Sequence, residues 1–163
     1  ADTIEVVATI FPVFVDGGDP IGVTGDRLTL TVPAGAGTTT FAGGPESDEG
    51  AFAFSAGGIG TVSYDRLEAV TNVDLTAAGG GLIIQGTNAD NDITIVGTGA
   101  ASLTVSIDGG PAVPFSGVSS LQVDGYAGDD DIIVPGLRRV GEEFIGRYGS
   151  FDFVLPRHAD VCG

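Results

Sequence analysis

The stretch DNDITIVGTGAASLTVSIDGG, residues 90–110, contains the pattern that indicates the fold of this chain. It holds two apolar runs, Ile93–Val96 and Leu103–Ile107, in which β-branched residues dominate. Gly, Asp and Asn residues lie on both sides of each run, as in Asp108-Gly109-Gly110. β-branched runs bounded by turn-forming residues are typical of short strands. The stretch therefore predicts two strands joined by tight turns.

The same pattern continues through most of the 163 residues and predicts an all-β protein. No window has a convincing helical period, and the best helical candidate, Leu137–Tyr148, is interrupted by Gly141 and Gly146. The expected strands are Thr3–Thr9, Val13–Val15, Leu28–Val32, Phe52–Ser55, Thr61–Tyr64, Val70–Leu75, Leu82–Gln85, Ile93–Val96, Leu103–Ile107, Val113–Phe115, Leu121–Val123 and Ile132–Val134.

Two kinds of internal similarity relate these segments to one another. The segment from Asp2 and the segment from Asp92 share landmarks in the same order, 90 to 95 residues apart. A Gly/Asp-rich turn that runs into a strand recurs at a shorter interval. Its copies are Gly43–Asp48 before Phe52, Gly86–Asp92 before Ile93, and Gly125–Asp131 before Ile132. Self-similarity at such periods is typical of repeat architectures.

Strands this short bury an apolar face only when copies of the unit stack on one another. We therefore expect a β-solenoid, similar to a parallel β-helix, over residues 1–134. A β-sandwich is the alternative, because strands spaced by about 8–12 residues also suit that fold. Residues 135–163 have a different composition and are expected to form a C-terminal cap or a docking segment.

The charge balance is strongly acidic. There are 22 Asp and Glu residues against six basic ones, all of them Arg, and the formal net charge is −16. Such a chain repels phosphate, so nucleic-acid binding is excluded as a function class. No apolar run is long enough for a transmembrane helix, and the start at Ala1-Asp2 resembles a processed product. These features predict an extracellular or cell-surface protein.

Part of the chain resembles a known group of sequences. Residues 82–134 are similar to the Gly/Asp-rich repeats of large bacterial surface and secreted proteins, many of them from planctomycetes. The segment Gly125–Ile133 is also similar to the RTX nonapeptide G-G-x-G-x-D-x-U-x, except that Tyr126 replaces the second Gly. In the copy at Gly86, Asn91 replaces the Asp. The resemblance implies an extracellular repeat protein whose turns bind Ca²⁺.

Calcium prefers six to eight oxygen ligands from carboxylates and from the carbonyls of tight turns. The expected metal residues are Asp129, Asp130, Asp131, Gly125, Gly128, Asp90, Asp92 and Asp48. The alternative is an acidic turn in solvent, in which the Asp side chains accept hydrogen bonds from the backbone.

An enzyme active site is not expected. His158 is the sole histidine, Cys162 is the sole cysteine, and Gly-x-Ser-x-Gly is absent. A zinc site needs more His or Cys residues than this, and a Ser-His-Asp triad would have to use His158 although no nucleophile motif surrounds any Ser. A carbohydrate-active β-helix stays as an alternative because carboxylates are abundant, although the chain lacks the Trp and Lys residues that such sites commonly use.

The ends of the chain predict self-association, either end to end or by strand donation. The sequence starts within a repeat, and a solenoid end without a polar cap offers unpaired strand edges to a second copy. The run Thr3–Val15 is apolar enough to be donated, and the C-terminal segment combines Arg with aromatic residues. The expected contact residues are Ile4, Val6, Ile10, Phe11, Phe14, Arg138, Arg139, Phe144, Tyr148 and Phe151. The favoured function is a surface-layer, matrix or filament subunit, and the alternative is a calcium-dependent adhesion or binding module of a larger secreted protein.

Overall fold

The structure is a computed structural model that describes residues 2–18, 25–135, 138–140, 143–148 and 151–155; beyond residue 135 it describes the backbone only. These residues form strands and no helix, so the all-β class predicted from the sequence is confirmed. No described helix is long and apolar enough to cross a membrane.

The described strands form two large mixed sheets, neither of them closed, and a small C-terminal sheet. The seven-stranded sheet contains β1 (Thr3–Val7), β3 (Arg27–Thr31), β7 (Ala69–Asp74), β9 (Asp92–Gly99), β10 (Ser102–Ile107), β11 (Val113–Ser116) and β13 (Asp131–Ile133). The six-stranded sheet contains β2 (Val13–Asp16), β4 (Thr39–Gly43), β5 (Gly50–Phe54), β6 (Val62–Asp65), β8 (Gly81–Gln85) and β12 (Ser120–Asp124). The C-terminal sheet contains β14 (Arg138–Val140), β15 (Glu143–Tyr148) and β16 (Phe151–Leu155).

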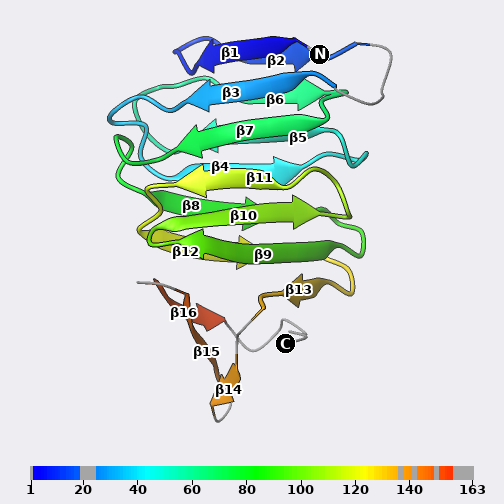
Figure 1. The fold of residues 1–163 in the computed structure, drawn as a ribbon, viewed down its shortest axis with the longest axis vertical. Helices are drawn as coiled ribbons and strands as arrows, with labels where there is room; N and C mark the ends of the chain where they lie inside the picture. The colour runs from blue at the N-terminus through cyan, green and yellow to red at the C-terminus, as the bar shows by residue number, and fades with distance from the viewer. Residues whose placement is uncertain (1, 19–24, 136–137, 141–142, 149–150, 156–163) are drawn as a thin grey trace.

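The chain passes repeatedly from one large sheet to the other, and the two sheets lie face to face (Figure 1). Strands from successive passes pair in parallel, as β1 does with β3 and β3 with β7. Two antiparallel meanders interrupt this pattern, β4–β5–β6 in one sheet and β9–β10–β11 in the other. Each meander brings the chain back along the sheet, so the strand order differs from the sequence order.

The core lies between the two sheets because alternate side chains of each strand point inward. Phe41 and Phe52 stack with ring centroids 5.2 Å apart, and Phe115 of the opposite sheet approaches both rings. Aromatic side chains bury large apolar areas, so this cluster ties the meander of the six-stranded sheet to the seven-stranded sheet.

All twelve strands expected from the sequence are present, with small shifts at their ends. The sequence pattern missed β4, whose Ala42 and Gly43 have low strand propensity, and it also missed β14, β15 and β16. The weak helical candidate at Leu137–Tyr148 is wrong, since β14 and β15 lie there.

The two segments that share landmarks 90 to 95 residues apart are not equivalent in the fold. Asp16-Gly17-Gly18 begins at the last residue of β2 in the six-stranded sheet, whereas Asp108-Gly109-Gly110 follows β10 in the seven-stranded sheet. By contrast, the turns at Gly86–Asp92 and Gly125–Asp131 do correspond, because β9 and β13 pair in register from Asp92 and Asp131 onward.

Candidate functional site

The strands β1 and β2 lie at the same end of the stack, each as the last strand of its sheet (Figure 1). β1 pairs with β3, and β2 pairs with β6, both in parallel. Among the described residues, no strand pairs with the outer edge of either. We call this part of the molecule the β1–β2 end.

The inward side chains of this end are less well covered than those of the next layer. The register places Ile4 opposite Leu28 and Val6 opposite Leu30. Leu28 and Leu30 are 0% and 2% exposed, whereas Ile4 and Val6 are only partly buried. In β2, Val15 is buried but Val13 is only partly buried. The hydrophobic core is therefore incompletely covered at this end.

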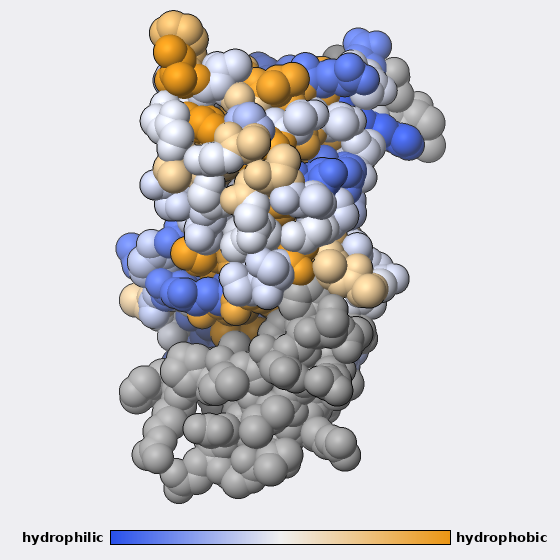
Figure 2. Space-filling model, turned by 90° about the vertical axis from the view of Figure 1, so that its left-hand side faces the viewer, coloured by the Kyte–Doolittle hydropathy of each residue, from blue (hydrophilic) through white to orange (hydrophobic). Residues whose placement is uncertain are grey.

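Large apolar side chains outside the core are also exposed here. Val7, Ile10, Phe11 and Phe14 are 59%, 67%, 69% and 65% exposed. Figure 2 shows hydrophobic side chains on the surface at the upper end, which is the β1–β2 end of Figure 1. Contiguous exposed apolar surface commonly marks an interaction site.

The turn that carries Ile10 and Phe11 is held in place by hydrogen bonds. The Gly60 amide donates to the Thr9 carbonyl at 2.7 Å, and the Phe11 amide donates to the Thr9 hydroxyl at 3.3 Å. A Cβ on Gly60 would lie 2.4 Å from the Phe11 carbonyl carbon. A side chain at residue 60 would push this turn away, so the absence of one lets the turn pack directly on the backbone.

The unpaired edges present identifiable backbone groups. In β1, the Asp2 carbonyl and the Ala8 amide both bond to the β3 side, so the even-numbered residues face β3. The N–H and C=O groups of Thr3, Glu5 and Val7 therefore point to the outer edge. In β2, the backbone amides of Val13 and Gly17 bond to the β6 side. The backbone N–H and C=O groups of Phe14 and Asp16 therefore point to the outer edge.

An ion pair fixes the end of β2. The Arg66 Nε atom donates to an oxygen of Asp16 at 3.1 Å, and a second guanidinium nitrogen donates to its other oxygen. The hydrogen bond from Arg66, and secondarily the one from the Gly18 amide, lowers the pKa of Asp16 below its usual value. Asp16 is thus ionised and neutralised locally at neutral pH.

The predicted metal residues lie mainly in two turns that stack on one another. An oxygen of Asp130 accepts a hydrogen bond from the Asn91 amide at 3.0 Å, and an oxygen of Asp90 accepts one from the Asp129 amide at 2.9 Å. The Asp131 amide donates to the Asn91 carbonyl at 2.9 Å. The carboxylates of Asp90 and Asp130 therefore link one turn to the other through backbone amides.

The other predicted ligands are positioned by the same strands and by one distant hairpin. Asp92 and Asp131 begin β9 and β13 as register partners. Gly128 has φ +131°, and a Cβ there would lie 2.7 Å from the Ala89 carbonyl oxygen, which explains the glycine. Gly125 adjoins the Asp130 side chain. Asp48 lies apart from these two turns, in the β4–β5 hairpin.

Within the described part of the chain, no group of three or more His, Cys, Asp or Glu side chains is arranged to hold a metal ion. A calcium ion at the stacked turns would have to compete for carboxylate oxygens that now accept amide hydrogens. The structure therefore provides a scaffold of carboxylates at this position, but not an assembled cage.

Asn91 is the residue of these turns that the sequence pattern undervalued. It is 3% exposed, and its side chain accepts from the Thr87 amide at 2.6 Å and donates to Asp108 at 2.8 Å. The other oxygen of Asp108 accepts from the Asp92 amide at 2.8 Å. The departure from the nonapeptide at Asn91 was the available signal, because an amide can both accept and donate, whereas the ionised carboxylate of the usual Asp can only accept.

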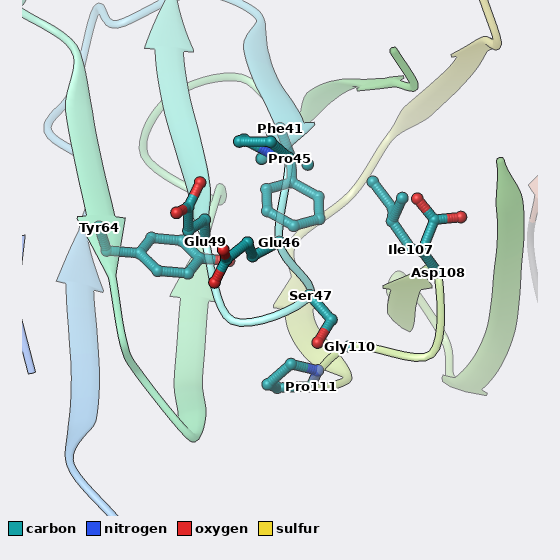
Figure 3. A pocket seen from close by; sticks show the side chains of 12 residues that line it. Phe41, Pro45, Glu46, Ser47, Glu49, Tyr64, Ile107, Asp108, Gly110 and Pro111 are labelled. Atoms are coloured by element: carbon teal, nitrogen blue, oxygen red, sulfur yellow. The ribbon is translucent and has the colours of Figure 1, made fainter. Parts of the chain in front are cut away.

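A second acidic feature surrounds the β4–β5 hairpin (Figure 3). Glu46 and Glu49 line a pocket of about 40 Å³ together with Tyr64 and Asp108. Desolvation raises the pKa of Glu49 above its usual value, and the nearby Asp65, Glu46 and Asp48 carboxylates raise it further. A water molecule needs about 10–15 Å³ of cavity volume, so the pocket has room for a few waters and not for a sugar ring.

The remaining predicted residues lie beyond the described side chains. Arg138 and Arg139 are in β14, Phe144 and Tyr148 in β15, and Phe151 in β16. The structure does not describe the side chains of these five residues, and His158 and Cys162 lie outside the described residues. Of the predicted contact residues, the structure thus brings together Ile4, Val6, Ile10, Phe11 and Phe14, and it adds Val7.

In comparisons with known proteins, the chain matches no protein-family model, no curated protein sequence and no solved structure.

Proposed function

We propose that this protein is a structural subunit that assembles by adding strand layers at the β1–β2 end. The observation that carries the proposal is the contrast between Ile4 and Val6, which are partly exposed, and their register partners Leu28 and Leu30, which are buried. The same inward positions are covered in the second layer and uncovered in the last one. A further layer would cover them.

The energetic gain from such a layer is substantial. Full burial of a Val, Leu or Ile side chain stabilises by about 1.5–3 kcal/mol relative to exposure. Ile4, Val6 and Val13 are all incompletely buried, and they lie beside strongly exposed Ile10 and Phe11. The exposed edge also offers unpaired N–H and C=O groups, which favour pairing with another strand.

End-to-end association fits the structure better than donation of the segment Thr3–Val15. Both strands of that segment already pair within the chain, β1 with β3 and β2 with β6. Donation would break both ladders and expose Val15 and Leu28, which are now buried. Addition of a layer to the existing edges breaks no described contact.

The architecture that we propose for this assembly is a β-solenoid with inserted meanders. Parallel pairing of successive passes, β1–β3–β7–β11 in one sheet and β4–β8–β12 in the other, supports it. The meanders β4–β6 and β9–β11 are antiparallel, as strands of a sandwich are. An extracellular location is part of the proposal and rests on the acidic, lysine-free composition.

Sedimentation of three matched proteins tests the proposal. The unmodified chain is expected to associate with rising concentration. Phe14→Lys places a charge beside the outer edge of β2, and edge lysines block strand pairing, so this variant should stay monomeric. Asn72→Lys adds the same charge at an exposed position of the inner strand β7 and should associate like the unmodified chain. A monomeric unmodified chain, or equal association of all three proteins, would overturn the proposal.

Calcium binding at the stacked turns is a second candidate function. It is supported by the position of Asp90 and Asp130 on the two stacked turns and by the register pairing of Asp92 with Asp131. Calorimetric titration with CaCl₂, compared with the Asp129→Asn, Asp131→Asn double variant, tests it. Heat that is lost in the variant supports a site there, and absence of heat in the unmodified chain rejects one.

A further inference from the structure

A second and larger cavity lies beside the hairpin pocket of Figure 3. Its volume is about 270 Å³, near the lower end of the range of about 300–1,000 Å³ that is usual for small-molecule sites. The two cavities share Gly43, Gly44, Glu49 and Tyr64 in their walls. They therefore lie side by side at the β4–β5 hairpin, and one ligand can reach into both.

The larger cavity opens on the outer face of the six-stranded sheet. Phe14 alternates with the inward Val13 and Val15, so its ring lies on this outer face. The register places Phe14 opposite Ser63, and Ser63 opposite Ala51. Ser63 and Ala51 have small side chains, which leaves a hollow between the Phe14 ring and the hairpin. The cavity is therefore a feature of the face of the sheet and not of its unpaired edge.

Negative charge gathers at the wall that the two cavities share. Desolvation raises the pKa of Glu49, and the neighbouring carboxylates, that of Asp65 first, raise it further. Arg66 lies nearby, but it donates to both carboxylate oxygens of Asp16 and its Nε atom is 3.9 Å from an oxygen of Asp65. One guanidinium thus serves two carboxylates, and Glu49 stays in a negative field that favours a cation beside it.

A buried hydroxyl belongs to the same wall. Tyr64 is 6% exposed, and its ring packs on Phe52 with centroids 6.0 Å apart. The hydroxyl lies over Gly50, where a Cβ would come within 2.5 Å of its oxygen, and the ring points toward Glu46 and Glu49 (Figure 3). Among the described residues, none donates a hydrogen bond to this hydroxyl or accepts one from it. A buried polar group without a partner is costly, so a ligand that bonds to this oxygen is favoured.

We propose that the two cavities bind a small organic cation, an ammonium group on a short apolar stem, with the ammonium between Glu49 and Tyr64 and the stem toward Phe14. An ammonium has three N–H donors and no acceptor, which suits a carboxylate and a phenol oxygen with free lone pairs. The Phe14 ring offers an apolar wall and a face that attracts cations. A metal ion fits less well, because no three acidic side chains of the described residues are arranged to hold one.

Calorimetric titration of the chain with n-butylammonium chloride in about 0.15 M NaCl, which screens distant charges, tests the proposal. We expect saturable heat, and none with 1-butanol, which has the same stem without the charge. Glu49→Gln should weaken binding by about tenfold or more, since a hydrogen bond to a charged group is lost. Asp129→Asn removes a carboxylate that lines neither cavity and should bind like the unmodified chain.

Further variants test the position of the ligand. Tyr64→Phe removes only the hydroxyl and should weaken binding. Ala51→Leu fills the larger cavity and should block binding, whereas Ala53→Leu makes the same change on the same face of β5, outside both cavities, and should not.

A second amine distinguishes the sources of the ammonium group. Nα-acetyl-lysine methylamide carries the same group on a peptide backbone. Binding of both amines assigns the cavities to lysine side chains as well as to free amines, and binding of n-butylammonium alone assigns them to free amines.

Three results would overturn the proposal: no saturable heat with n-butylammonium, equal heat with 1-butanol, or equal affinity of the Glu49→Gln and Asp129→Asn variants. The proposal is independent of assembly at the β1–β2 end, because binding is measured by heat and assembly by sedimentation.

Discussion

Asp130 and Asn91 are 39 residues apart in the sequence, yet a carboxylate oxygen of Asp130 accepts a hydrogen bond from the backbone amide of Asn91 at 3.0 Å. The bond joins two successive Gly/Asp-rich turns. Together with the bond from the Asp129 amide to Asp90, it converts acidic side chains into links between layers of the stack.

Asn91→Asp is expected to destabilise the protein by about 3 kcal/mol, since it breaks a buried hydrogen-bond network and leaves a charge uncompensated. The new carboxylate could no longer donate to Asp108 and would face a second negative charge. Urea denaturation measures the loss. Asn88→Asp, the same change at an exposed position three residues earlier, is the control and should shift stability little. Equal effects of the two substitutions on the free energy of unfolding would show that the hydrogen bonds of Asn91 do not stabilise the protein.

Glu49→Gln is expected to stabilise the protein at neutral pH and not at low pH. The pKa of Glu49 is raised in the folded state, so the folded protein holds this proton more tightly than the unfolded chain does. Stability is then lost as the pH rises above the usual Glu value of 4.5. The variant lacks this loss, so its advantage should appear above that pH and vanish below it.

Thermal unfolding as a function of pH measures this difference. Asp129→Asn removes one negative charge at an exposed site and serves as the control for net charge. An advantage of Glu49→Gln that is equally large at acidic pH would contradict the assignment.

Thr39→Val is expected to stabilise the protein by about 1 kcal/mol, because it removes a buried hydroxyl that lacks a hydrogen-bond partner. The Thr39 side chain is fully buried, and its hydroxyl has no partner among the described residues. Valine has nearly the same shape. Guanidinium denaturation gives the difference, with Thr40→Val on the partly exposed face of the same strand as the control. A destabilised Thr39→Val protein would mean that the hydroxyl has a partner.

Raising the salt concentration is expected to strengthen association. Each copy carries a formal charge of −16, so two copies repel one another, while the surface proposed to bring them together is mainly apolar. At about 0.5 M NaCl this repulsion is largely screened, because the Debye length falls well below its value of about 10 Å at 0.1 M. Sedimentation equilibrium across this range gives the dependence. Association that weakens with salt would indicate an interface held by ion pairs.

The sequence predicted local structure well because strand and turn chemistry is local. β-branched runs between glycines marked strands such as β9 and β10 correctly. The pattern could not show to which sheet each strand belongs, since this depends on the two meanders. Asp16-Gly17-Gly18 and Asp108-Gly109-Gly110 therefore look alike in sequence but end strands of different sheets.

The candidate site was predictable in part. The exposure of Ile10, Phe11 and Phe14 agrees with their prediction as contact residues from the apolar run Thr3–Val15. The sequence predicted that the Asp residues of the acidic turns either bind Ca²⁺ or accept hydrogen bonds from the backbone. The bonds that Asp90 and Asp130 accept from backbone amides depend on how the two turns stack, and the sequence does not show this stacking. The role of Asn91 required the position of Asp108, which lies one strand away from it.

Backbone hydrogen exchange in β1 tests the central claim most directly. The amides of Ile4 and Val6 face β3, whereas those of Glu5 and Val7 face the outer edge. We expect Ile4 and Val6 to be protected at all concentrations, and Glu5 and Val7 to gain protection as the protein concentration rises. Rapid exchange of Glu5 and Val7 that does not change with concentration would contradict assembly at the β1–β2 end.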